Sequence, residues 1–197
     1  GKTEAGAIWL NPEKPSPYAF YQFWLGVADA DVYRFMRYFT FLSVADIADI
    51  EKKDAESGVK PEAQRILAEE MTRLIHGEDG LLAAQRITES LFSDRFDGLS
   101  EADLLQLKQD GLPFSILKRS ELADATLIQV LVDAQMAPSG KQVKDALQRA
   151  AVFVNGQAKS LDDNMKVSDC FAGESSYFGR FFLCRMGKKK YHLFEVV

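Results

Sequence analysis

Helical patterns follow one another up to Leu112-Pro113, and beyond that point two short helical patterns are followed by short strand patterns. In residues 29–42, apolar side chains recur three or four positions apart, as one buried helix face requires. They are Val32, Phe35, Met36, Phe39 and Leu42. No apolar run is long enough to predict a membrane-spanning helix. The pattern predicts an α+β protein in which a helical body precedes a smaller mixed module.

Cap signals divide the helical body into separate helices. The pairs Ser43-Asp46 and Ser100-Asp103 have the spacing of a capping box and predict two helix starts. Pro61 fits the first turn of a helix that ends at His76-Gly77, and another helix follows to Phe92. Pro12, Pro15 and Pro17 predict an irregular lead before the helical patterns.

The second part of the chain reads as two short helices broken at Pro138, followed by four strands. The strand patterns are "AVFVNGQ", "KVSD", "RFFLCRM" and "KKYHLFEV", and the last two flank a hairpin turn at 186–188. We therefore divide the chain into a lead, a helical domain, a linker that can flex and an α+β domain. Their expected bounds are 1–15, 16–112, 113–122 and 123–197.

Charge is distributed unevenly along the chain, whose net charge is −5. Residues 131–197 carry 10 Lys/Arg against 7 Asp/Glu, a net of +3, so the preceding 130 residues carry −8. A basic module on an acidic body favours binding to a polyanion. Alternatively, the basic face is solvated and binds nothing. Two histidines and two scattered cysteines predict free thiols and no metal site.

The run "PSGKQVKDALQRAAVFVNGQ", residues 138–157, combines a basic helix, a strand and an Asn-Gly turn. A helix N-terminus attracts phosphate, lysines along a helix can follow a nucleic-acid backbone, and Asn-Gly gives a tight turn. The run resembles the S4 RNA-binding domain. The candidate RNA-binding residues are Ser139, Lys141, Lys144, Gln148, Arg149, Asn155 and Gly156. Lys188, Lys189 and Lys190 at the expected hairpin tip are either further RNA contacts or protection of an edge strand.

The helical segments 16–43 and 63–92 resemble the anticodon-binding region of bacterial tyrosyl-tRNA synthetases, a family in which an S4 domain follows. The resemblance implies an all-helical anticodon-binding domain, an S4-like RNA-binding domain and recognition of tRNA-Tyr. It also implies that the full-length enzyme attaches tyrosine to tRNA-Tyr with ATP and Mg²⁺. The initial "GKTE" resembles the end of the KMSKS-type loop, where Lys2 would contact ATP phosphates. The alternative for "GKT" is the end of a P-loop, but that motif needs an upstream glycine and a strand, and neither is present.

Four charged residues of the 29–42 helix are anticodon candidates: Asp29, Asp31, Arg34 and Arg37. The aspartates could accept hydrogen bonds from an anticodon base or could cap the helix. The arginines could hold phosphates or could be solvated. The aromatic cluster in 20–24 is typical of a core, with base stacking as the alternative. We expect His76 to act as a helix-end cation, and His192 has no partner pattern.

Because the resemblance covers the C-terminal part of the family and the chain lacks an initiator methionine, we expect a fragment without the catalytic half. Such a fragment would not activate tyrosine and would be a monomer, whereas the full-length enzyme would dimerise through its catalytic domain. We expect a cytoplasmic protein that does not bind a membrane. The alternatives are a free-standing S4-type adaptor for another structured RNA, and a helical protein-interaction module.

Overall fold

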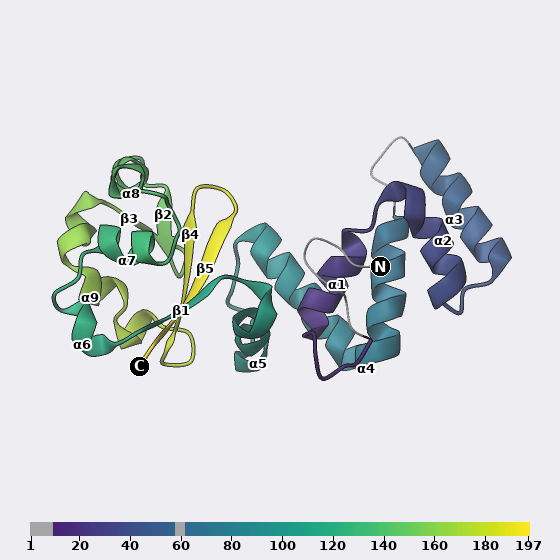
Figure 1. The fold of residues 1–197 in the computed structure, drawn as a ribbon, viewed down its shortest axis with the longest axis horizontal. Helices are drawn as coiled ribbons and strands as arrows, with labels where there is room; N and C mark the ends of the chain where they lie inside the picture. Colours follow the sequence, from purple (N-terminus) through teal and green to yellow (C-terminus); the bar gives the residue numbers. More distant parts are fainter. Residues whose placement is uncertain (1–9, 58–61) are drawn as a thin grey trace. The chain divides into compact units, whose positions relative to one another are not determined.

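A computed structural model of the chain describes residues 10–57 and 62–197 (Figure 1). The chain divides between Glu89 and Ser90 into two compact units. Each unit has its own cluster of buried apolar side chains. The fold class is α+β, as the sequence predicted, because the regular elements among the described residues of the first unit are helices and the second unit contains a sheet.

The first unit is built from α1 (Pro17–Leu25), α2 (Asp29–Phe39), α3 (Val44–Ser57) and most of α4 (Ala63–Ser93). The sequence analysis did not predict α1. Its start is nevertheless marked, because the Ser16 side chain accepts a hydrogen bond from the Ala19 N–H and Pro17 occupies the first turn. The predicted starts of the other helices are confirmed where described, and Ser43 and Asp46 exchange reciprocal hydrogen bonds before α3. Gly58 and Pro61 lie outside the described residues.

Helix α4 is interrupted at Gly77, whose φ of 73° and ψ of −179° are not helical. The predicted end of one helix at His76-Gly77 and the start of another are therefore confirmed. Near the start of the second unit, α5 (Glu101–Gln106) begins with the predicted capping box of Ser100 and Asp103. It continues into the π-helical turn η1 (Leu107–Gly111).

A five-stranded sheet organises the second unit in the order β1-β5-β4-β2-β3. The strands are β1 (Phe114–Leu117), β2 (Val152–Val154), β3 (Gln157–Lys159), β4 (Phe181–Met186) and β5 (Lys190–Val196). Strand β1 runs parallel to β5, and the other neighbours are antiparallel. The predicted β4–β5 hairpin and the predicted Asn155-Gly156 turn are confirmed, and the turn leads into β3, which was not predicted from the sequence.

Short helices cover one face of this sheet, while α5 lies on the other side (Figure 1). They are α6 (Arg119–Leu122), α7 (Leu127–Asp133), α8 (Gly140–Gln148), η2 (Leu161–Met165), α9 (Val167–Cys170) and η3 (Gly173–Ser175). Alternate side chains of β4 and β5 face opposite ways. Phe182 and Phe194 pack with Leu131 and Leu147 in the core under the helices.

Two segments differ from the expectation. The range 113–122, expected as a linker, contributes β1 and α6 to the second unit. The local sequence does not mark β1 as a strand. It is a strand because it pairs with β5, which lies almost eighty residues later in the chain. The "KVSD" segment was predicted as a strand, which is wrong: it enters helix α9. Val167 and Cys170, three positions apart, are both buried, which is helical rather than strand spacing.

Candidate nucleic-acid interface

Helix α8 is held against the core by one face, which leaves its polar faces outside. Val143, Ala146 and Leu147 are buried. At the N-terminus the main-chain carbonyl of Ser139 accepts hydrogen bonds from the N–H groups of Gln142 (3.1 Å) and Val143 (3.3 Å). The Ser139 hydroxyl makes no capping bond. The helix therefore presents an exposed serine beside its positive end.

The polar side chains of α8 form two neighbouring strips. At 3.6 residues per turn, Lys141, Lys144 and Gln148 project along one line. Gln142, Asp145 and Arg149 project along the next, and all six residues are exposed. Arg149, which the sequence analysis grouped with the lysines, donates from Nε to the main-chain oxygen of Asp145 (3.1 Å). The lysine strip and Arg149 therefore lie on two neighbouring sides of the helix.

The Asn155-Gly156 turn joins β2 to β3 with both residues in the left-handed region, at φ of 46° and 77°. The Asn155 side chain is engaged at both ends. Its Nδ2 donates to the Ser175 carbonyl (2.5 Å), and its Oδ1 accepts from the Leu183 N–H (2.7 Å). Asn155 thus holds the turn in place and leaves Gly156 exposed at its tip.

The β4–β5 hairpin carries three consecutive lysines at its tip. Lys188 and Lys189 lie in the turn, Lys190 is the first residue of β5, and all three are exposed. Across residues 10–57 and 62–197, no carboxylate forms an ion pair with any of them. Their charge is therefore available to a partner.

Arg185 fixes the hairpin beneath these lysines. Its guanidinium binds Asp94 through Nε–Oδ1 (3.1 Å) and Nη2–Oδ2 (2.8 Å). It also lies 3.9 Å from the centre of the Phe153 ring and donates to the Gly187 carbonyl in the turn. The Tyr191 hydroxyl donates to the same Asp94 carboxylate (2.9 Å), and burial, followed by this hydrogen bond, raises the Tyr191 pKa to about 12. Arg185 is therefore a supporting residue, although the sequence counts it among the basic charges.

A groove of about 290 Å³ lies between α8 and the β4–β5 turn. Its lining combines side chains of the second α8 strip with the strand ends and the turn. The lining residues are Gln142, Asp145, Ala146, Arg149, Ala151, Met186 and Gly187. The structure thus brings together two segments that the sequence analysis named separately, the basic helix and the hairpin tip.

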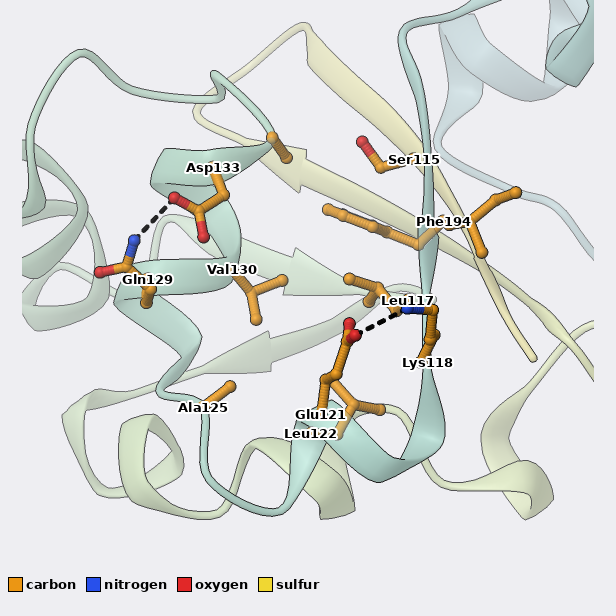
Figure 2. Close-up of a pocket in the computed structure, with 12 residues that line it drawn as sticks. Ser115, Leu117, Lys118, Glu121, Leu122, Ala125, Gln129, Val130, Asp133 and Phe194 are labelled. Atoms are coloured by element: carbon orange, nitrogen blue, oxygen red, sulfur yellow. Dashed lines mark hydrogen bonds and ion pairs between the residues drawn. The ribbon is translucent and has the colours of Figure 1, made fainter.

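Another cavity, of about 280 Å³, lies among β1, α6, α7 and β5 (Figure 2). Four of the polar side chains that line it pair with one another, as Figure 2 shows. Lys118 Nζ lies 3.0 Å from Glu121 Oε1, and Gln129 Nε2 donates to Asp133 Oδ1 (2.6 Å). We assign no ligand to this cavity.

The four anticodon candidates lie on α2, and each has a partner. Asp29 accepts from Gln64 Nε2 (2.5 Å), and Arg34 forms an ion pair with Asp31 (2.5 Å). Arg37 forms an ion pair with Glu51 (3.0 Å). Neither aspartate caps the helix, because the N-cap residue is Ala28 and makes no side-chain capping bond. Both still lie in the first turn, where the helix dipole favours negative charge.

The aromatic cluster in 20–24 belongs to the core, as predicted, since Phe20, Tyr21 and Trp24 are buried. Other aromatic side chains are exposed, and their exposure was not predicted from the sequence. Tyr38 and Phe41, at and after the end of α2, are 70% and 90% exposed. Phe39, which the helical pattern assigned to the buried face, is 41% exposed. No spacing rule distinguishes it from buried Val32 and Met36.

The remaining candidates have simple environments. Lys2 lies outside the described residues. His76 precedes the break at Gly77, and its ring contacts Phe20. His192 is buried, bonds to Ser115 Oγ (2.9 Å), and has its pKa lowered to about 4 by burial and secondarily by Lys190. Cys170 and Cys184 are free and buried, and burial raises the pKa of each thiol.

The described part of the chain holds neither a candidate metal-binding cluster nor a candidate membrane-spanning helix. It contains no group of three or more histidine, cysteine or acidic side chains arranged to hold a metal ion. Within the same residues, no helix has the length and apolar character needed to cross a membrane.

Comparison with protein families divides the chain in nearly the same place as its structure. Residues 1–93 match the family "tRNA synthetases class I (W and Y)". Residues 104–194 match the "Tyrosine--tRNA ligase SYY-like C-terminal domain". Among solved structures, a C-terminally truncated Aspergillus nidulans mitochondrial tyrosyl-tRNA synthetase has a TM-score of 0.41 and 34% identity. That alignment covers 46% of this chain and 25% of the other.

Curated relatives match almost the whole chain. Tyrosine--tRNA ligase of Escherichia coli (strain 55989 / EAEC) is 50% identical over 193 residues, which is 98% of this chain and 43% of the relative. The enzyme of Dechloromonas aromatica (strain RCB) is 53% identical over 194 residues, 98% of this chain and 44% of the relative. The chain thus spans less than half the length of these relatives. It belongs to the tyrosyl-tRNA synthetase family and corresponds to the C-terminal part of its members.

Proposed function

We propose that this chain is the tRNA-binding part of a tyrosyl-tRNA synthetase and that it recognises tRNA-Tyr. One observation carries the proposal. Lys141 and Lys144 on α8, and Lys188–Lys190 on the hairpin, are exposed and free of ion pairs with the described residues. They belong to the unit that matches the ligase C-terminal domain. A polyanion with regularly spaced phosphates fits such a surface.

The two cationic segments are held in place in different ways, and both can contact the phosphate backbone of an RNA. Helix α8 is anchored by its buried face, and its N-terminal N–H groups with the Ser139 hydroxyl can bind one phosphate. The hairpin is held by Arg185 and Asp94, so Lys188–Lys190 project from a fixed support. We assign phosphate contacts to both segments, and we assign the Gly156 turn to close main-chain approach.

On α2, we propose that Asp29 and Asp31 accept hydrogen bonds from an anticodon base. Carboxylates are suited to this because unpaired bases offer N–H donors on their Watson–Crick edges. Arg34 and Arg37 would hold neighbouring phosphates when their surface ion pairs with Asp31 and Glu51 open. Such pairs are weak enough to exchange, since exposed ion pairs contribute about 0–1 kcal/mol.

For the full-length enzyme we propose ligation of tyrosine to tRNA-Tyr with ATP and Mg²⁺, in the cytoplasm, with Lys2 near the ATP phosphates. We further propose that the enzyme dimerises through the part that this chain does not span, so that the chain alone is a monomer of 22.1 kDa. Activation of tyrosine is assigned to the remaining length of the enzyme.

The test is tRNA binding measured at several salt concentrations. Changing Lys141, Lys144 and Arg149 together to Ala should weaken binding and reduce the slope of log K against log salt by about 2, because each phosphate contact contributes roughly 0.7–0.9. Preference for the tyrosine anticodon should be unchanged, because phosphate contacts do not read sequence. The matched control changes Lys118, Arg119 and Lys166 to Ala, three exposed cations of the same unit.

A second pair of variants tests the anticodon assignment in the same assay. Asp29→Asn and Asp31→Asn should leave the salt slope unchanged but reduce discrimination against an altered anticodon. A wild-type slope in the α8 triple variant would show that α8 does not contact phosphates. Equal binding of tRNA-Tyr and an unrelated tRNA by the wild type would favour a general structured-RNA adaptor instead.

A further inference from the structure

The groove between α8 and the β4–β5 turn differs chemically from the lysine strip beside it. Its walls include apolar surface from Ala146, Ala151 and Met186. Its polar lining residues are Gln142, Asp145 and Arg149. A surface that only held phosphates would need cations and would gain nothing from a carboxylate.

Asp145 is an exposed carboxylate in basic surroundings that forms no ion pair with any described residue. Lys141 lies four positions before it and Arg149 four after, both at helical ion-pair spacing. Arg149 instead donates to the Asp145 main-chain oxygen, so it does not neutralise the Asp145 side chain, and Asp145 lines the groove. An acid retained among phosphate-binding cations weakens non-specific RNA binding, so its presence calls for a different role.

We propose that this groove receives one unpaired guanine of the bound RNA and that Asp145 determines this specificity. Guanine presents two adjacent donors, N1–H and N2–H, on its Watson–Crick edge, and the two carboxylate oxygens can accept both. The apolar wall of Met186, Ala146 and Ala151 covers the face of the base. Lys141, Lys144, Lys188 and Lys189 lie on the segments that border the groove, where they hold the flanking phosphates.

The inference rests on the proposed function, because it assumes that α8 and the hairpin bind RNA. It deepens that function by adding a base-reading position in the second unit, apart from the candidates on α2. A phosphate-only surface and a base-reading groove respond in opposite ways when the acid is neutralised. Without a reading role, removing a negative charge strengthens binding to every RNA alike.

The experiment measures affinities of the 197-residue chain for tRNA-Tyr and for four nine-nucleotide RNAs, U4NU4, in which N is G, A, C or U. The wild type should prefer U4GU4 by about tenfold, within the roughly 5- to 150-fold range of a bidentate base contact. Asp145→Asn should remove this preference, because an amide offers only one acceptor atom. Its affinity for U9 should stay equal or rise. Asp162→Asn, an exposed acid of the same unit outside the groove, should retain the preference.

Each other outcome has a distinct meaning. If the wild type binds tRNA-Tyr but binds the four oligonucleotides equally, or not at all, the groove does not read guanine and the proposed function stands. If Asp145→Asn strengthens binding to all four equally and keeps the G preference, Asp145 is not the reader. If neither tRNA-Tyr nor any oligonucleotide binds, both the function and the inference are wrong. Far-UV circular dichroism of each variant checks that the fold is retained.

Discussion

At the scale of single residues, the basic charges of the second unit serve two purposes. Arg185 is bound to Asp94, Arg180 bridges Glu101 and Glu195, and Lys108 also binds Glu195. These cations compensate carboxylates within the fold, and Glu195 is almost fully buried. The lysines of α8 and of the hairpin tip form no ion pair with a described carboxylate and are among the cations left for a partner. Net charge therefore indicates the class of partner but overstates the number of contacts.

His192 should make the stability of the second unit depend on pH. Its pKa is about 4 in the fold and about 6.5 when unfolded, because burial disfavours the charged ring. Stability is therefore complete above pH 6.5 and falls as the pH drops towards 4, since only the unfolded chain binds the proton. The full loss is about 3 kcal/mol. The groups around the ring are Ser115, Phe194 and the positive Lys190.

Urea unfolding followed by circular dichroism at pH 7, 6 and 5 measures this loss. His192→Gln keeps a hydrogen-bonding side chain but does not titrate, so its stability should fall less over the same interval. Comparing the two proteins cancels the carboxylates that begin to titrate near pH 5. Equal pH dependence in both proteins would show that His192 is not the titrating group.

At the scale of elements, one glycine separates two helices that otherwise run together. The backbone of Gly77, at φ of 73° and ψ of −179°, lies in a region that side-chain-bearing residues rarely adopt. A Cβ there would meet no atom within 4 Å, so the cost of Gly77→Ala comes from the backbone alone. We expect a loss of about 1–3 kcal/mol in unfolding free energy.

Tryptophan fluorescence during urea unfolding measures the effect of Gly77→Ala, because buried Trp24 lies in the same unit. Gly26→Ala is the matched control. Gly26 has a φ of −88°, and an added Cβ would make only ordinary contacts at 3.5 Å. The control should change stability by less than about 1 kcal/mol. Similar effects at both positions would mean that the break in α4 does not depend on glycine.

At the scale of the whole molecule, the two units have separate cores, and both tryptophans precede Ser90. Fluorescence therefore follows the first unit, whereas circular dichroism follows both. Leu131→Ala, in the core of the second unit, should cost about 2–5 kcal/mol there. It should shift part of the dichroism transition and leave the fluorescence midpoint unchanged.

Met36→Ala is the reciprocal variant, because Met36 is fully buried in the first unit. It should destabilise the first unit by a comparable free energy and so lower the urea midpoint of the fluorescence transition. If Leu131→Ala shifts both signals equally, the two units unfold as one cooperative structure.

The sequence by itself determined the features that a few neighbouring residues encode. Helical spacing marked α2 to α5, the Ser100-Asp103 pair marked a helix start, and Gly77 marked a break. The Asn155-Gly156 turn was also visible, because only a few residue types readily adopt its backbone. The basic stretch of α8 belongs to the same class, since its charges are close in sequence.

Only the tertiary structure decided the features that depend on distant partners. Strand β1 exists because β5 pairs with it, and a four-residue segment after a proline carries too little pattern to predict that pairing. Arg185 is a support because Asp94, ninety-one positions earlier, accepts its hydrogen bonds. Asp145 faces a groove because the β4–β5 turn lies beside α8. Side-chain periodicity describes which face of an element is buried, whereas the roles of these residues depend on which other element is packed against them.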